Sequence, residues 1–166
     1  MNQVLASSAV EGFMFQCAFS PTSTTTLGGG TIANILQCYS GEPGPTTPII
    51  DCGGTGIVSL RDYNGGMKFI NYSGSSAHSI DLASGQIILD SSTITGGVWV
   101  VRGVGKLVDE VGTAIPSGTW NGTVTIINEL LTSTELDTWS EVEKNEVLAW
   151  SRKASDNAEK ASLKLG

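Results

Sequence analysis

The sequence predicts a mainly β protein: a β-solenoid (parallel β-helix-like) of short strands, followed by a C-terminal α-helix. Three observations support this fold class. Of the 21 glycines in the 166 residues, 20 lie before residue 131. In the same part of the chain, short apolar runs rich in β-branched residues alternate with glycine-containing turns. The residues after 131 are instead rich in Glu, Lys, Ala and Leu, which favour helices.

The change in composition places a boundary after Leu131. Residues 1–130 carry 9 acids and 4 bases, whereas the much shorter segment 131–166 carries 7 acids and 5 bases. We therefore divide the chain into a β-rich body, 1–131, and a C-terminal helix, 132–166. Within the body, 12–47 is a loop-rich N-terminal part and 48–131 is a strand-repeat part. A chain of this length is long enough to bury a core of its own.

The repeat in 48–131 consists of one short strand and one turn. Its turn signals are Gly53-Gly54, Gly65-Gly66, Ser73-Gly74, Ser84-Gly85, Gly96-Gly97 and Gly103/Gly105. Near the end of each strand-like run a polar residue follows an apolar one: Asp51, Asp62, Asn71, Asp81, Asp90 and Arg102. These polar residues recur at nearly even intervals, once in each strand-and-turn unit. Two such units would make one coil of about 20 residues.

Two architectures fit a unit of this length. In a solenoid, glycine turns the chain at each corner and successive coils stack about 4.8 Å apart. The polar columns expected from that stacking are Asp51, Asn71 and Asp90, and separately Asp62, Asp81 and Arg102. The alternative is an antiparallel β-sandwich or meander with tight hairpins, for which "YNGG" at 63–66 is a candidate turn. Few Asn-Gly or Asp-Gly pairs occupy the turns, so the pattern favours the solenoid.

The N-terminal part is less regular. Cys17, Cys38 and Cys52 occupy matching places in three apolar segments, which predicts an internal ladder of small apolar side chains. The polar segments 20–30 and 40–48 are predicted to be surface loops. An odd number of cysteines without C-x-x-C spacing indicates neither a disulfide framework nor a zinc site.

The predicted helix begins at a capping box formed by Thr132 and Glu135. Its apolar stripe is narrow, so the helix needs a partner, which is either its own domain or another protein chain. Large aromatic side chains dominate contact energies, and they lead the residues that we expect to anchor assembly: Leu136, Trp139, Val147 and Trp150.

The stretch "GVGK" at 103–106 is a fragment of a phosphate-binding loop. That loop requires G-x-x-x-x-G-K-[ST], but here Val100 replaces the first glycine and Leu107 replaces the hydroxyl residue. The glycines also follow a predicted strand and open no helix. They are therefore predicted to be corners of the repeat, and no nucleotide site is assigned.

Candidate catalytic groups are few. His78 is the only histidine, which excludes a His-based zinc cluster, and we expect it at an exposed strand edge. Repeated Asp residues at strand ends are more often turn formers than catalysts. No catalytic residue, metal ligand or cofactor site is assigned. A glycan-binding or glycan-cleaving groove, which needs paired carboxylates beside aromatics, would use Asp62, Asp81 or Asp90 with Tyr63 or Tyr72.

Overall charge and hydropathy exclude two classes of partner. The net charge of −7 argues against nucleic acid, which requires clustered Lys and Arg. No apolar run approaches the 18 or so residues of a membrane span. The N-terminus lacks the basic start of a secretory signal, which predicts synthesis in a cytoplasm.

One part of the chain resembles a known family. The stretch "IDLASGQIILDSSTITGGVWVVRGVGKLVDE" (80–110), followed by "VTIINELL" (124–131), is similar to a segment of large tail and fibre proteins of tailed bacteriophages. The preceding "PIIDCGGTGIVSLRDYNGGMKFINYSG" is similar to the same region, so the resemblance covers Pro48 to Leu131. It implies a virion structural protein, usually homotrimeric, with a β-solenoid-like shaft, and no catalytic residue is transferred from it.

We therefore expect a structural component of a bacteriophage virion, of the tail, fibre or spike type, that assembles as an oligomer and docks or presents a β shaft. The alternative is a spike module that binds or depolymerises host glycans. The expected partners are further copies of the chain (a homotrimer is favoured), other virion proteins and, for the alternative, a host surface glycan. No cofactor is expected. The expected location is the virion, after synthesis in the host cytoplasm.

Overall fold

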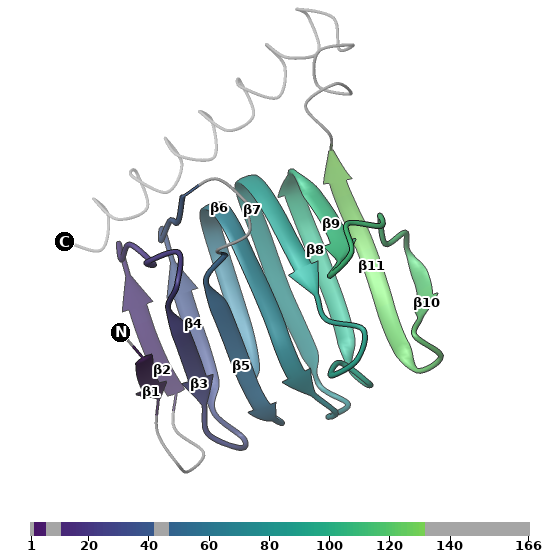
Figure 1. Ribbon diagram of the computed structural model, residues 1–166, viewed down its shortest axis with the longest axis horizontal. Helices are drawn as coiled ribbons and strands as arrows, with labels where there is room; N and C mark the ends of the chain where they lie inside the picture. The colour runs from purple at the N-terminus through teal and green to yellow at the C-terminus, as the bar shows by residue number, and fades with distance from the viewer. Residues whose placement is uncertain (1, 6–10, 42–46, 132–166) are drawn as a thin grey trace, which may run out of the picture. The chain divides into compact units, whose positions relative to one another are not determined.

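The computed structural model describes residues 2–5, 11–41 and 47–131, which form a β-solenoid of about four turns (Figure 1). The predicted solenoid is therefore confirmed. The predicted helix 132–166 and its anchors lie outside the described residues.

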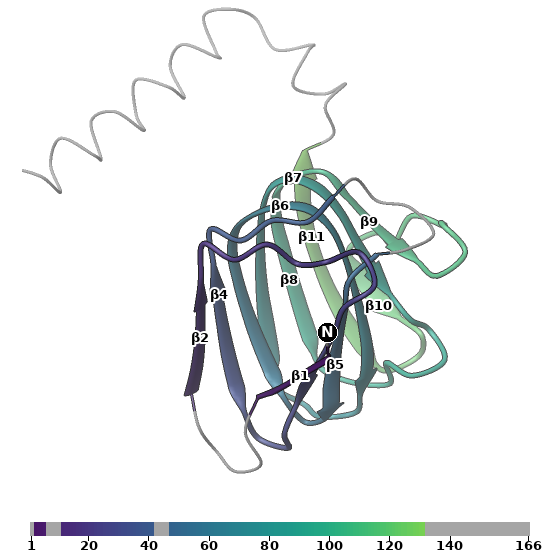
Figure 2. The same cartoon turned by 60° about the vertical axis from the view of Figure 1, so that its left-hand side comes forward.

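The strands form two walls that face each other across the core (Figure 2). We call the first wall sheet 1. It contains β2 (Glu11–Phe15), β4 (Ile32–Leu36), the first part of β6 (Ile57–Tyr72), the first part of β7 (Ala77–Leu89), β8 (Val98–Val104) and β11 (Val124–Leu131). Sheet 2 contains β1 (Asn2–Leu5), β3 (Thr24–Leu27), β5 (Ile49–Gly54), the second parts of β6 and β7, and β9 (Lys106–Asp109).

All neighbours within the two sheets pair in parallel, and we call one turn of the chain through both sheets a rung. In the middle rungs the register advances by two strand-and-turn units per rung, as predicted: Lys68 is aligned with Ile88, and Ile88 with Val108. The antiparallel meander is wrong, because the "YNGG" segment bends β6 from one sheet into the other and forms no hairpin. The one antiparallel strand pair in the described residues is β10 (Gly118–Trp120) with β11.

Glycine forms one corner of the middle rungs. Gly65, Gly85 and Gly105 stack on successive rungs with positive φ angles of 117°, 121° and 151°. A Cβ atom on Gly85 would lie 2.0 Å from the carbonyl oxygen of Gly65, and one on Gly105 would lie 2.4 Å from that of Gly85. Only glycine lets the backbones approach so closely. The "GVGK" glycines are thus corners, as predicted.

Polar residues form other bends by adopting the left-handed conformation. Asp62 and Asn71 have φ angles of 52° and 60°, and Gln16 and Gln37 both have 51°. Asn and Asp tolerate this region because their short side chains bond to nearby backbone or side-chain groups. Two residues of the predicted polar series, Asp62 and Asn71, therefore occupy positions where the backbone bends.

The predicted polar columns are right in part. Asp81 is aligned with Arg102 as expected, and Asp62 lies at a bulge where two residues of β6 oppose one residue of β7. The other column is wrong by one position, because Asp51 is aligned with Ile70 instead of Asn71. The Asn71 side chain still donates a hydrogen bond to Asp51 Oδ1 at 3.1 Å.

Large side chains from both sheets fill the centre of the solenoid. Trp99 is fully buried, packs edge-on against Phe69 and Tyr72, and donates its indole N–H to the carbonyl of Gly96. The other largest fully buried side chains are Tyr63, Tyr72, Phe69, Leu27, Ile35, Ile50, Leu60, Met67, Ile80, Ile87 and Leu89.

The expectation of an exposed His78 is wrong. The ring is fully buried and stacks on Trp99 with 3.8 Å between ring centroids and 7° between planes. Its Nδ1 accepts a hydrogen bond from the backbone N–H of Val58 at 3.2 Å, while Nε2 has no partner. Burial lowers the pKa of His78 to about 3, so the ring is neutral. Its position follows from the alternation of β7, which points His78, Ile80 and Leu82 inward.

The N-terminal part differs from its prediction in two ways. The segment 20–30 is not one loop, because Thr24–Leu27 forms β3 and pairs with β5. The predicted internal cysteine ladder is wrong: Cys17 and Cys38 lie on adjacent rungs, but Cys17 is exposed, and Cys52 is buried in sheet 2.

Candidate assembly surface

The outer side of sheet 1 presents three columns of side chains, and each column takes one residue from each of the six strand segments of the sheet. The first column contains Glu11, Ile32, Ile57, Ala77, Val98 and Thr125. The second contains Phe13, Asn34, Ser59, Ser79, Val100 and Ile127. The third contains Phe15, Leu36, Arg61, Asp81, Arg102 and Glu129.

The first two columns form a nearly uncharged surface. Among these described positions, Glu11 carries the one formal charge, and it lies on the first rung. Large apolar side chains on this side are open to solvent: Phe13 is 70% exposed, Phe15 60% and Ile32 41%. Exposed large apolar side chains on a surface with few charges are typical of a site that another protein covers.

Apart from Glu11, the charges of these three columns lie in the third, where their sign alternates along the solenoid. Arg61, Asp81, Arg102 and Glu129 follow each other from β6 to β11. Arg102 Nε lies 2.6 Å from Glu129 Oε2, but both side chains are more than half exposed, so this ion pair contributes little to stability. This column resembles the charged rim of a protein–protein interface. Charges at such a rim contribute more to the choice of partner than to affinity.

The sequence itself carries a signal for this surface. Strands such as "VWVV" in β8 and "VTII" in β11 are apolar or uncharged at both inward and outward positions. Strands of parallel sheets read this way when both of their faces are covered. The core covers the inner side of sheet 1, so the outer side is the one that lacks a cover among the described residues.

The outer side of sheet 2 is different. Charged residues lie in the middle of its columns, where Lys68 Nζ and Asp90 Oδ2 form an ion pair at 2.8 Å. Asp51 and Lys106 add further charges on this side. A partner would have to desolvate these groups, which costs free energy. Sheet 1 is therefore the better assembly surface.

The candidate glycan-groove residues do not gather at one place. Asp62 and Asp81 are exposed near one corner of sheet 1, whereas Asp90 follows the part of β7 that belongs to sheet 2. The aromatics proposed to accompany them, Tyr63 and Tyr72, are buried in the core. Neither of these rings can stack on a sugar.

Asp90 behaves as a turn former. Its Oδ1 accepts hydrogen bonds from the Ser92 backbone N–H at 3.1 Å and from the Ser92 hydroxyl. Partial burial raises the pKa of Asp90, but the hydrogen bonds from Lys68 and Ser92 outweigh that effect and lower it. A general acid for glycoside cleavage needs a raised pKa, so Asp90 is not suited to that role.

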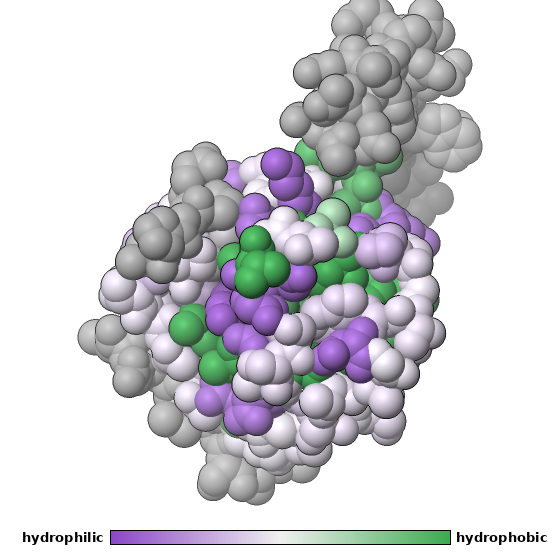
Figure 3. Space-filling model, turned by 45° about the vertical axis from the view of Figure 1, so that its right-hand side comes forward, coloured by the Kyte–Doolittle hydropathy of each residue, from purple (hydrophilic) through white to green (hydrophobic). Residues whose placement is uncertain are grey.

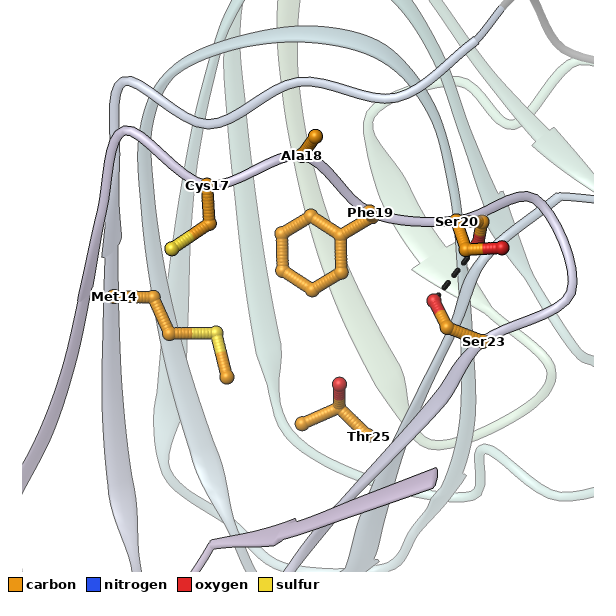
Figure 4. A pocket seen from close by; sticks show the side chains of 7 residues that line it. All are labelled: Met14, Cys17, Ala18, Phe19, Ser20, Ser23 and Thr25. Atoms are coloured by element: carbon orange, nitrogen blue, oxygen red, sulfur yellow. Dashed lines mark hydrogen bonds between the residues drawn. The ribbon is translucent and has the colours of Figure 1, made fainter. Parts of the chain in front are cut away.

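Each end of the solenoid holds a shallow cavity. The N-terminal one has a volume of about 210 Å³, and Met14, Cys17 and Phe19 point into it (Figure 4). The C-terminal one, of about 380 Å³, is lined by Leu107, Leu130 and their neighbours. Figure 3 looks toward the C-terminal end and shows hydrophilic and hydrophobic residues interspersed over it. Neither cavity gathers a set of convergent catalytic groups.

Two further findings concern the described part of the chain alone. It contains no group of three or more His, Cys, Asp or Glu side chains placed to hold a metal ion. Nor does any helix within it have the length and hydropathy needed to cross a membrane.

Comparison with known proteins gives no relative: no family model, no curated protein and no solved structure matches the chain.

Proposed function

We propose that this protein is a structural component of a bacteriophage virion, of the tail, fibre or spike type, that assembles as a homo-oligomer through the outer side of sheet 1. The observation that carries the proposal is the nearly uncharged outer surface made by the first two columns. The resemblance of 48–131 to phage tail and fibre segments supplies the class of assembly, and a trimer is the form that it favours.

The physical case rests on the free energy of covering that surface. Each fully covered Ile, Val or Phe side chain contributes about 1.5–3 kcal/mol relative to an exposed one. Several such side chains lie within one sheet, including Phe13, Ile32, Ile57, Val100 and Ile127. The sheet is rigid, because its inner side packs on a filled core. Little conformational entropy is therefore lost when a second surface packs against it.

The glycan-binding or depolymerising alternative has less support. Its three carboxylates, Asp62, Asp81 and Asp90, lie on different sheets or at a turn, and the aromatics expected beside them are buried. Nothing in the described residues favours it over assembly.

Sedimentation velocity of the full chain at micromolar concentration tests the assembly surface. The wild type is expected to sediment as an oligomer. Ile57→Lys or Val100→Lys, each of which places a charge in the middle of the uncharged columns, should shift the protein toward monomer. Ile70→Lys is the matched control, because Ile70 points outward from sheet 2 and should leave the oligomer intact.

The outcomes separate the parts of the proposal. A monomeric wild type refutes self-assembly, and equal effects of all three substitutions refute the choice of sheet 1. Mass spectrometry of purified particles of the virus that encodes the chain tests the virion location, which the absence of its peptides would overturn.

A further inference from the structure

Cys17 and Cys38 lie next to each other on the first two rungs, just after β2 and β4 end. The pairs on either side of them, Phe15 with Leu36 and Ala18 with Tyr39, are aligned with the same offset. Cys17 is therefore in register with Cys38. Backbone hydrogen bonds hold this register: Tyr39 N–H donates to the Cys17 carbonyl at 3.0 Å, and Phe19 N–H to the Tyr39 carbonyl at 2.8 Å.

The distance between the two residues suits a disulfide. Strands in register lie about 4.8 Å apart, which falls within the Cα separation of about 4.4–6.8 Å seen across disulfides. Cys38 Sγ accepts a hydrogen bond from the Cys17 backbone N–H at 3.2 Å, so this sulfur already lies beside Cys17.

The two thiols differ in access, as a reaction in two steps requires. Cys17 is exposed and lines the N-terminal cavity beside Met14 and Phe19 (Figure 4). Cys38 is buried, and this burial raises the pKa of its thiol. Cys17 is therefore the thiol that an oxidant meets first, and Cys38 is the thiol beneath it that completes the bond.

We propose that Cys17 and Cys38 form a disulfide that ties the first rung to the second when the protein meets an oxidising environment. With a small disulfide such as oxidised glutathione, the Cys17 thiolate attacks one sulfur, the glutathione S–S bond breaks, and one glutathione thiol leaves. The Cys38 thiolate then attacks Cys17 Sγ and releases the second glutathione thiol. The two protein thiols lose two electrons and two protons, and the small disulfide gains them.

The bond would act beside the N-terminal cavity. Met14 and Phe19 are each 9% exposed beside the N-terminal cavity, whereas the core residues of the middle rungs are almost completely covered. A cross-link that closes a loop of about 22 residues restricts the unfolded chain and should raise the midpoint of thermal unfolding by on the order of 10 °C. The disulfide would form whether or not the protein belongs to a virion.

The test treats the folded, full-length protein with oxidised glutathione at low protein concentration, followed by intact mass and non-reducing peptide mapping. The wild type is expected to lose about 2 Da and to yield a peptide that links 17 to 38. Cys38→Ser should instead stop at a glutathione adduct on Cys17, about 305 Da heavier. Closure in the wild type should speed up as the pH rises, because Cys38 must ionise.

Cys52 provides the matched control. It is fully buried in sheet 2, and burial raises its thiol pKa to about 12. Cys52 should therefore take no part in the reaction, and Cys52→Ser should still form the link between Cys17 and Cys38. The proposal is overturned if the wild-type protein keeps a glutathione adduct and does not form the disulfide, or if the disulfide links two copies of the chain. It is also overturned if Cys17→Ser loses about 2 Da, because the disulfide would then not require Cys17.

Discussion

The middle rungs of the solenoid and its first rungs contain the same kinds of strand, but their core side chains are packed to different degrees. From β6 to β9 the register advances by nearly the same step at each rung, and residues such as Phe69, Ile87 and Trp99 are completely covered. Between β4 and β6 the step is longer, as the alignment of Ile35 with Leu60 shows. The first rung leaves a cavity beside Phe19.

This difference indicates that the corners, more than the strands, determine how tightly a rung closes. In the middle rungs the stacked glycines bring successive backbones into direct contact. On the first two rungs Phe19 and Ser40 occupy the corresponding corner, and longer segments connect the strands. Three changes test this comparison, beginning with the largest expected effect.

Substitution of a corner glycine should be the most damaging change. Gly85→Ala places Cβ 2.0 Å from the Gly65 carbonyl oxygen, so the rungs must separate. We expect a loss of about 4 kcal/mol or more in the free energy of unfolding, measured by chemical denaturation. Gly112→Ala is the control: its φ of 89° is also left-handed, but no atom lies within 4 Å of the added carbon. It should cost about 1–2 kcal/mol, and equal losses at the two sites would contradict the role of the corner.

Truncation of one phenylalanine in each region should measure the difference in packing. Phe69→Ala removes a fully covered ring that packs on Trp99, and we expect a loss of about 4 kcal/mol. Phe19→Ala removes a ring that borders an existing cavity, and we expect about half of that loss. Urea denaturation of both variants provides the measurement. If Phe19→Ala proves as costly as Phe69→Ala, the first rung is packed as tightly as the middle.

Acid should weaken the middle rungs through His78. Its pKa falls from its usual value near 6.5 to about 3 in the folded protein, so folding favours the neutral ring. The contribution of the neutral ring to the free energy of unfolding is complete above about pH 6.5 and is lost as the pH falls toward 3. About 2 kcal/mol of it should be lost between pH 7 and pH 5. Denaturation at the two pH values gives this difference.

His78→Asn is the matched variant for this effect. Its side-chain oxygen can still accept the Val58 N–H but does not titrate. The variant should be less stable than the wild type at pH 7 yet lose less between pH 7 and pH 5. An unchanged pH dependence would show that other groups cause the loss.

Much of the fold could be predicted from the residues. The spacing of glycine turns predicted coils of two strand-and-turn units and parallel stacking, because a glycine at each corner is a backbone requirement visible in the sequence. The burial of His78, Tyr63 and Tyr72 could not be predicted in this way. Each of them alternates with polar or small neighbours, and the direction of a side chain depends on where the corner places the start of its strand.

The assembly surface was predictable in part. The continuous apolar runs of β8 and β11 indicate two covered faces, but the side of the solenoid on which they meet is decided by the register between rungs. The neighbouring positions of Cys17 and Cys38 likewise depend on a register that the chain adopts only once β2 and β4 have paired.

The amino-acid sequence alone was sufficient to establish the class of fold, the length of the repeat and the residues able to turn its corners, because these follow from local backbone chemistry. The stacking of rungs settled which side chains face the core, which form the uncharged outer side of sheet 1, and which cysteines become neighbours. Each rung takes its register from the rung beneath it, so residues that are distant in the chain meet only after that register forms.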